Sequence, residues 1–405
     1  MHIIFTNDFI FHSNDEVVYH SWLMKLLRIP LKLSTGLDIL PLEGLFSRKE
    51  FYKLSGFDEP GNYANYDISV FNERSWNYVR SFLNSNVFVV GVELGLGIRR
   101  FLSQENINFI NFCFHPYKLM DDIYFLVNTN NQEVYEKINK YKLPNEVMQF
   151  RAIYWKERIN RTASMAKKLK KNSCLFVGQS LKDRSVFDGE KFLSILDFKE
   201  RLKELARKYS AIYYVPHPYA EYDESIEKYL EHADYIYKIS DVPTYHLLAS
   251  DNIRKVVSLS SSVLYEAEFF GKEIEYLFRP LFDIDSDFGE NAFISIYRDY
   301  FCPSFWEDIC STVLETIPSP KMNFCGESAN FIRDLLNNYH GYIFLEKNKL
   351  LERRIEVIER ELIDRASRNK LGSKYLKYIK YFLMERITWG KRKDHYRSKL
   401  RKLMD

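Results

Sequence analysis

The stretch CLFVGQSLKDRS, residues 174–185, decides the fold, because a short apolar strand runs directly into a polar loop. A stretch with helical periodicity, Phe198–Lys208, follows it, and the next apolar run, Ala211–Val215, has the composition of a second strand. Such alternation predicts a parallel sheet that helices cover on both faces. The alternation continues on both sides of this stretch, so the fold class predicted is α/β.

Short runs rich in β-branched and aromatic residues recur through the first 330 residues. The predicted strands are His2–Phe5, Val87–Gly91, Ile107–Phe114, Ile123–Val127, Cys174–Val177, Ala211–Val215, Tyr235–Ile239, Lys255–Ser258 and Ile274–Phe278. Nine strands fit two Rossmann-like units better than one. The polar, basic stretch Arg158–Asn172 is the expected boundary. We therefore predict domains over 1–165 and 172–330, followed by a basic helical extension over 331–405.

The composition fits a folded protein of a reducing compartment. Hydrophobic residues make up 46% of the 405 residues and aromatic residues 16%, enough to bury two cores and to exclude a disordered or fibrous chain. The five cysteines are scattered, without the CxxC spacing of a zinc site or a disulfide framework. The first residues are typical of a strand rather than a signal peptide. The longest apolar run, Val87–Ile98, is too short to span a bilayer and contains Glu93. We expect a cytoplasmic protein.

Chemically useful side chains follow the first strand of the predicted second domain. In doubly wound sheets, ligands bind outside the carboxyl ends of the strands, so residues there are candidates for a site. Gln179, Asp183 and Arg184 follow strand Cys174–Val177. Asp183 can act as a nucleophile or stabilise charge, with Lys182 or Arg184 near an anionic sugar. The alternative is that Asp183 caps a helix on a surface loop.

The next strand of this domain leads into a His-Pro pair, in YYVPHPYAE, residues 213–221. Pro218 restricts the residue before it to extended conformations, which holds His217 at the end of the strand. A histidine held there can donate a hydrogen bond to a phosphate and stabilise a leaving nucleotide. The alternative is that His217 is only a turn residue.

A third strand of this domain leads into a serine-rich turn, in VVSLSSSVLYEAEFFGKE, residues 256–273. Hydroxyls and backbone N–H groups at the start of a helix bind anions, so Ser260, Ser261 and Ser262 are a predicted phosphate site. Glu266 lies on the helix that follows. Ordinary serine capping is the alternative.

In this order, QxxxD, HP and a serine-rich turn that leads into a helix containing Glu-Ala resemble the β-Kdo transferases of bacterial capsule and O-antigen assembly. More distantly, they resemble the bacterial sialyltransferases of GT-B fold. The resemblance covers roughly residues 174–275. It implies a GT-B enzyme, in which two Rossmann-like domains face a cleft, the first binding the acceptor and the second the CMP-sugar. The residues that match are Gln179 with Asp183, His217 with Pro218, and Ser260, Ser261 and Ser262 with Glu266.

The resemblance implies a CMP-Kdo-dependent glycosyltransferase that moves Kdo onto a surface-polysaccharide or lipid-linked oligosaccharide acceptor. Asp183 would attack the anomeric carbon and form a covalent adduct, so that two displacements retain the configuration. His217 and the serines would hold the CMP phosphate, in a donor site that also includes Gln179, Arg184, Pro218 and Glu266. Neither a metal nor another cofactor is expected. Sialic, pseudaminic or legionaminic acid as the sugar, an inverting reaction that leaves Asp183 structural, and a non-catalytic glycan-binding or scaffold module all stay open.

The acceptor hydroxyl needs a general base, which GT-B enzymes usually supply from the first domain. The related enzymes tend to carry an acidic D/E-D-G segment there, which this sequence lacks. Our first candidate is Glu93, which follows a strand and lies among glycines that would let a substrate approach the backbone. His115, the pair Asp121 and Asp122, and Asp8 are the other candidates.

The end of the chain differs from the rest in charge. Lys and Arg greatly outnumber Asp and Glu over 368–405, although the whole chain has a formal net charge of only +3. Lysines flank an apolar stripe in this region, a pattern typical of docking to a membrane surface. A contact with a partner protein of an assembly complex is an alternative, whereas no nucleic-acid-binding fold accompanies the charge. We therefore expect a protein at the inner face of the inner membrane, with no nucleic acid as partner.

Overall fold

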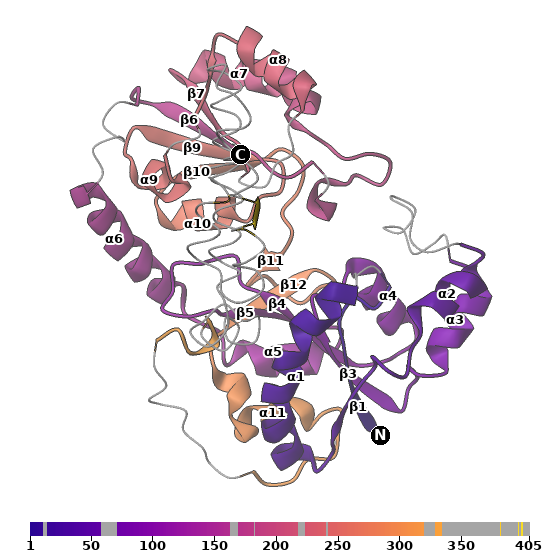
Figure 1. The fold of residues 1–405 in the computed structure, drawn as a ribbon. Coiled ribbons are helices and arrows are strands. Elements are labelled where there is room, and N and C mark those ends of the chain that lie inside the picture. The colour runs from indigo at the N-terminus through magenta and orange to yellow at the C-terminus, as the bar shows by residue number, and fades with distance from the viewer. Residues whose placement is uncertain are drawn as a thin grey trace. The chain divides into compact units, whose positions relative to one another are not determined.

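A computed structural model gives the fold (Figure 1). The structure describes residues 1–10, 14–57, 71–162, 169–181, 183–217, 223–239, 242–319, 329–333, 381, 396 and 398–399. The chain divides into two units, Met1–Glu327 and Ser328–Asp405. Most of the predicted basic extension, 331–405, lies outside the described residues, and so do Lys182 and Pro218.

Among the described residues, the first sheet has seven strands in the order β11-β12-β5-β4-β3-β1-β2. Their bounds are His2–Thr6 (β1), Ile39–Pro41 (β2), Val87–Val92 (β3), Phe109–Phe114 (β4), Phe125–Thr129 (β5), Asp283–Ile284 (β11) and Ala292–Ile296 (β12). Strands β1 to β4 are parallel, and β5 is antiparallel to both β4 and β12. A loop without a helix joins β4 to β5, and parallel pairing would require a longer crossover.

The helices that belong with this sheet are Asn14–Thr35 (α1), Arg48–Ser55 (α2), Glu73–Arg80 (α3), Leu96–Gln104 (α4) and Gln132–Asn139 (α5), and Pro303–Cys310 (α11) packs against α1. Helix Asn145–Thr162 (α6) instead packs with residues of the second sheet and its helices. Local sequence sets several of their ends. The Asn72 side chain accepts hydrogen bonds from two backbone N–H groups at the start of α3, and Gly56, with φ of 80°, ends α2 in the left-handed conformation.

In the part of the chain that the structure describes, the second sheet has five parallel strands in the order β10-β9-β6-β7-β8. The strands are Ser173–Val177 (β6), Ile212–Val215 (β7), Ile236–Lys238 (β8), Ile253–Ser258 (β9) and Glu273–Tyr276 (β10). The helices between them are Lys199–Lys208 (α7), Glu224–His232 (α8), Thr244–Ala249 (α9) and Val263–Phe269 (α10). Read from β8 to β10, the chain order is the 3-2-1-4-5 of a Rossmann half, and the order of connection reverses between β6 and β9.

Alternation along the central strand β6 explains why helices cover both faces of the second sheet. Cys174 and Phe176 pack in one cluster with residues of α7 and α8. Leu175 and Val177 pack in another cluster with residues of α9 and α10. Successive side chains of a strand point to opposite faces, so an uninterrupted apolar run is what a strand buried on both faces requires.

The predicted fold class, α/β with two Rossmann-like sheets, is confirmed. All nine predicted strands are present, as β1 and β3 to β10. Two features differ from the expectation. Strand β5 is antiparallel, and β11, β12 and α11 join the first sheet and its helices, although they lie within the range 172–330 assigned to the second domain. The side chain of Arg99 helps to hold β12 beside β5, because it donates hydrogen bonds to Asn128 of β5 and to the backbone oxygen of Glu290 before β12.

Candidate functional site

The strand order of the second sheet brings three predicted segments to one edge. Strand β6 lies between β9 and β7, and all three strands run in the same direction. Gln179 follows β6, His217 follows β7 and Ser260 follows β9. The carboxyl ends of parallel strands meet at one edge of the sheet, and ligands of such sheets bind at the point where the strand order reverses, here between β6 and β9.

Gln179 bridges this reversal point. Its Oε1 accepts hydrogen bonds from the backbone N–H of Ser260 at 2.7 Å and from the hydroxyl of Ser258 at 3.3 Å. Its Nε2 donates to the hydroxyl of Ser185 at 3.1 Å. One amide side chain therefore connects the loop after β6 with the serine-rich turn after β9.

The three serines have different surroundings. The hydroxyl of Ser260 is buried, with the residue 1% exposed, and has no hydrogen-bond partner among the described residues. A buried hydroxyl without a partner costs about 1–3 kcal/mol, which a ligand oxygen would offset. The hydroxyl of Ser261 accepts a hydrogen bond from the N–H of Val263, whereas the side chain of Ser262, directly before α10, does not cap that helix.

Asp183 and His217 are within electrostatic reach of each other. Asp183 is exposed, and its carboxylate accepts a hydrogen bond from the N–H of Ser185 at 2.8 Å, which caps the short 3-10 helix Arg184–Val186. Burial lowers the pKa of His217 below its usual 6.5, Asp183 raises it and Lys118 lowers it. Burial therefore favours the neutral form of His217, and the charges of a carboxylate of its own domain and of a lysine of the first domain act on it in opposite directions.

Arg184 connects the loop after β6 with the first sheet. Its Nη1 lies 3.0 Å from Oδ2 of Asp8, a fully buried carboxylate that follows β1 and also accepts a hydrogen bond from the N–H of Gly95 at 3.1 Å. A Cβ atom at Gly95 would lie only 2.3 Å from Oδ2 of Asp8 and 2.7 Å from Nη2 of Arg184. Glycine at this position thus leaves the space in which the ion pair forms.

Glu93 follows β3, next to β1, where the strand order of the first sheet also reverses. Its φ of 50° lies in the left-handed region, which costs a residue with a side chain of this size about 1 kcal/mol or more. The side chain of Asn111 supports this turn by accepting a hydrogen bond from the N–H of Leu94. A carboxylate on a residue with a strained backbone at the end of a strand is compatible with the predicted role of Glu93 as a base.

Glu266 lies against the first domain rather than within the serine-rich turn. Its Oε1 accepts a hydrogen bond from the backbone N–H of Lys118 at 2.7 Å, and its two oxygens are 2.9 and 3.0 Å from the hydroxyl of Tyr245. The residue is 1% exposed, and burial raises the pKa of its carboxyl to about 7. Nothing in the sequence pattern of residues 256–273 indicates the partner Lys118, because that partner comes from the other sheet.

The other candidates for the base have structural partners. Nε2 of His115 is 3.0 Å from the hydroxyl of Ser295, its Nδ1 accepts from the N–H of Tyr117, and burial lowers its pKa to about 3. Asp122 is buried and pairs with Arg298 at 2.5 Å. Asp121 accepts a hydrogen bond from Tyr124 and lies 3.5 Å from Arg151. None of these partners belongs to the segments that contain Gln179 or Ser260.

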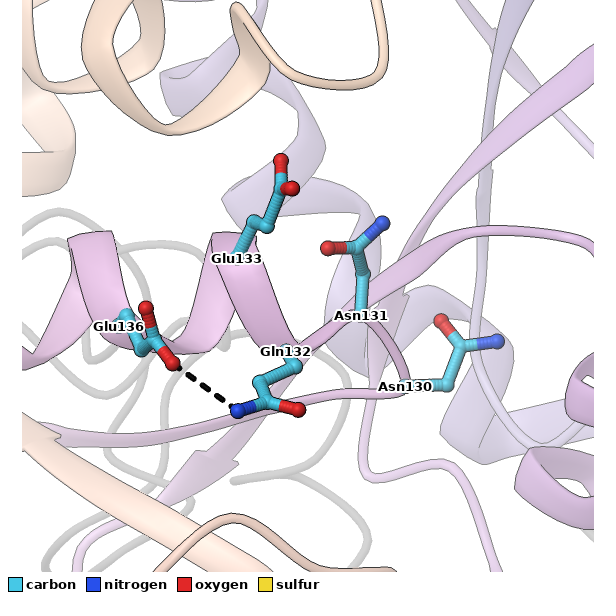
Figure 2. A pocket seen from close by; sticks show the side chains of 5 residues that line it. All are labelled: Asn130, Asn131, Gln132, Glu133 and Glu136. Carbon is cyan, nitrogen blue, oxygen red and sulfur yellow. Dashed lines mark hydrogen bonds between the residues drawn. The ribbon is translucent and has the colours of Figure 1, made fainter.

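A polar hollow lies elsewhere on the first domain (Figure 2). Figure 2 shows Gln132 hydrogen-bonded to Glu136 within it. Its other lining residues are Asn130, Asn131 and Glu133. Because β5 is antiparallel to β4, Asn130 lies beside the start of β4, at the edge of the sheet opposite to Glu93. The hollow is therefore separate from the candidate site.

Among the described residues, no group of three or more His, Cys, Asp or Glu side chains could hold a metal ion. No helix formed by the described residues is both long enough and apolar enough to cross a membrane.

Comparison with solved structures identifies distant matches. Thermosulfurimonas dismutans KpsC, a beta Kdo 2,7 transferase, has 15% identity and a TM-score of 0.36, with 83% of this chain and 99% of that chain covered. A Methanocaldococcus jannaschii UDP-GlcNAc 2-epimerase has 12% identity and a TM-score of 0.28, covering 84% and 100%. A Neisseria meningitidis UDP-GlcNAc 2-epimerase has 13% identity and a TM-score of 0.24, covering 68% and 82%. No curated protein sequence matches significantly.

One family model matches the chain, that of alpha-2,8-polysialyltransferase (POLYST), over residues 68–276. The match spans slightly more than half of the 405 residues and extends from before β3 to the end of β10. It includes Glu93, Asp183, His217 and the serine-rich turn. The chain therefore belongs to the alpha-2,8-polysialyltransferase (POLYST) family, and it is a CMP-sugar glycosyltransferase.

Proposed function

We propose that this glycosyltransferase moves a sialic-acid-type nonulosonic acid from its CMP donor onto a hydroxyl of a surface-polysaccharide acceptor. The observation that carries the proposal is the bridge of Gln179 to Ser260 and Ser185, with His217 on the neighbouring strand. Nucleotides bind at such reversal points in doubly wound sheets. Membership of the POLYST family supports a sialic acid as the sugar.

The side chains at this edge suit a CMP-sugar. His217 can donate a hydrogen bond to a phosphate oxygen, and the buried hydroxyl of Ser260 offers a second donor. Arg184 brings a cation to the same loop for the sugar carboxylate, although it also pairs with Asp8. These groups stabilise the charge that grows on the phosphate as CMP leaves, and they need no metal to do so.

For the chemical step, we propose that Asp183 is the nucleophile. Its carboxylate would form a bond to the anomeric carbon while the bond from that carbon to the phosphate oxygen breaks, and CMP would leave with the electron pair. The acceptor hydroxyl would then displace Asp183, with its proton passing to Glu93, and the configuration would be retained. The exposure of Asp183 and its electrostatic coupling to His217 support this assignment.

A single displacement is the alternative, and one observation favours it. The carboxylate of Asp183 already caps the 3-10 helix Arg184–Val186 through Ser185. If capping is its whole role, Glu93 deprotonates the acceptor directly and the configuration inverts.

Kdo is the second candidate for the sugar. The order of QxxxD, HP and serine-rich turn, which resembles the β-Kdo transferases, favours it. Kdo and sialic acids both carry a carboxylate at the anomeric carbon, so the same donor site suits either. Their different chain lengths would be distinguished by contacts beyond that carboxylate.

The test is the release of CMP from CMP-sialic acid and from CMP-Kdo, with glycan acceptors present. We expect turnover with CMP-sialic acid and a loss of roughly a hundredfold or more in His217→Ala, which removes a donor to the leaving phosphate. Turnover with CMP-Kdo alone would show that the sugar is Kdo instead of a sialic acid, and the proposed site would stay the same. If a folded protein released CMP from neither donor, a glycan-binding or scaffold role would take the place of this proposal.

A further inference from the structure

The loop that joins β4 to β5 carries an exposed lysine whose backbone reaches helix α10, which follows the serine-rich turn. Lys118 belongs to the first domain, yet its backbone N–H donates to Glu266 of α10 at 2.7 Å. Helix α10 begins directly after Ser262, the last serine of the predicted phosphate site. The backbone of Lys118 is thus held beside the helix that follows the serine-rich turn.

Glu266, which accepts this hydrogen bond, is buried and also contacts Tyr245. The hydroxyl of Tyr245, on α9, lies within 3.0 Å of both carboxylate oxygens of Glu266. Glu266 is 1% exposed, so losing the Lys118 hydrogen bond would leave Oε1 of a buried carboxylate with one hydrogen bond fewer. The position of Lys118 is therefore specified by a contact between the two domains.

The charge of Lys118 acts at the predicted phosphate-binding histidine. After burial, Lys118 is the group that lowers the pKa of His217, whereas Asp183 raises it. A lysine of the first domain and a histidine of the second therefore lie within electrostatic range of each other. Sequence spacing cannot indicate this, because Lys118 and His217 belong to different domains.

We propose that Lys118 binds the phosphate of the CMP donor together with His217, and that Glu266 is a positioning residue for Lys118. This inference rests on the proposed function. In the donor, the phosphate is a diester with one negative charge. When the bond between the anomeric carbon and the phosphate oxygen breaks, the electron pair stays on that oxygen and CMP acquires a second negative charge. Lys118 therefore stabilises the leaving CMP more strongly than the intact donor, which favours the transition state.

The test compares Lys118→Met with Lys140→Met, an exposed lysine at the end of α5 that serves as the matched control. We expect the affinity for CMP to fall roughly tenfold in Lys118→Met and to stay unchanged in the control. The affinity for cytidine, which has no phosphate, should stay the same in both variants. In turnover, kcat should fall more than the KM for the donor rises, because the lost contact strengthens as the bond breaks.

Glu266 variants test the positioning role. Glu266→Gln keeps a carbonyl oxygen that accepts from the N–H of Lys118, so its affinity for CMP should stay near that of the wild type. Glu266→Ala removes the acceptor and should weaken CMP binding without changing cytidine binding. If Glu266→Ala does not fold, the comparison of Lys118→Met with its control still decides the proposal.

The outcomes separate this inference from the proposed function. A wild-type protein that fails to bind CMP would overturn both. A wild-type protein that binds CMP, with unchanged affinity and unchanged kcat in Lys118→Met, would overturn the role of Lys118 alone. Equal losses of CMP and cytidine affinity in Lys118→Met would also overturn it, because they would show a structural effect rather than a contact with the phosphate.

Discussion

Three carboxylates near the candidate site have three different environments. Asp183 is exposed and accepts a backbone hydrogen bond, Asp8 is buried and paired with Arg184, and Glu266 is buried beside a tyrosine and a backbone N–H. Environments of this kind separate the roles of chemically similar groups. We assign the nucleophile to the exposed carboxylate and positioning to the two buried ones.

Glu266 predicts a specific dependence of stability on pH. Burial raises the pKa of its carboxyl to about 7 from 4.5. The folded protein holds this proton to a higher pH than the unfolded chain does. The free energy of unfolding should therefore fall by about 3 kcal/mol as the pH rises from 4.5 to about 7. Urea unfolding of Glu266→Gln at several pH values should show a flatter dependence by that amount. Identical slopes for variant and wild type would contradict the assignment.

His217 predicts that CMP binding is coupled to proton uptake. Its pKa lies below 6.5 in the free protein, chiefly because it is buried, and a bound phosphate dianion would raise it again. Near neutral pH, the complex should therefore take up a fraction of a proton. Calorimetry in buffers of different ionisation enthalpy measures this fraction directly, and His217→Gln should abolish it. Uptake that persists in His217→Gln would assign the proton to another group.

How far these residues could be predicted from the sequence depends on how local their contacts are. Gln179, His217 and Ser260 follow apolar runs directly, so their places at one sheet edge could be predicted, and the structure brings them there. The partner of Glu266 could not, because Lys118 lies 148 positions away on the other domain. The hydrogen bond from the backbone N–H of Ser260 to Gln179 could likewise not be predicted from the pattern, although both residues were candidates.

The ion pair of Asp8 and Arg184 connects the loop after β1 with the loop after β6. Asp8 is fully buried while the side chain of Arg184 is 36% exposed, so we expect Arg184→Met to destabilise the fold by about 1–3 kcal/mol. The matched control is Arg100→Met, because Arg100 pairs with Glu290 where both side chains are about half exposed, which is worth about 1 kcal/mol or less. Chemical unfolding measures both.

A double variant tests whether the two loops are energetically coupled. If the pair acts as described, Asp8→Asn combined with Arg184→Met should cost less than the sum of the two single changes, because each single change already removes the interaction. Strict additivity would show that the contact contributes nothing to the coupling of the loops.

The strands differed in how well the sequence predicted them. Buried apolar runs such as Phe88–Val90 are evident without a structure, and all nine predicted strands are present. Strand β2 is only three residues long with one buried residue, so it gives almost no periodic signal. Strand β12 is fully buried, but no local pattern shows that it pairs with β5, since that choice depends on packing between distant parts of the chain.

At the scale of the whole molecule, helix α11 packs against α1, so the last described helix of the first unit is joined to its first helix. Residues 1–327 form one compact unit, and the basic segment 368–405 lies outside it. We predict that a chain ending at Glu327 unfolds cooperatively and binds CMP as the full chain does. It should lose binding to anionic phospholipid vesicles, measured by flotation, because the apolar stripe and the lysines that flank it are removed. Equal vesicle binding by both chains would exclude the tail as the membrane contact.

The central claim is that CMP binds where the strand order of the second sheet reverses. Calorimetric titration with CMP should show binding to the wild type and a roughly tenfold or greater loss in Gln179→Ala, which removes the bridge to Ser260. Gln132→Ala, in the polar hollow of Figure 2, is the matched control and should bind CMP normally. Normal binding by Gln179→Ala together with a loss in Gln132→Ala would place the nucleotide in the hollow and contradict the account.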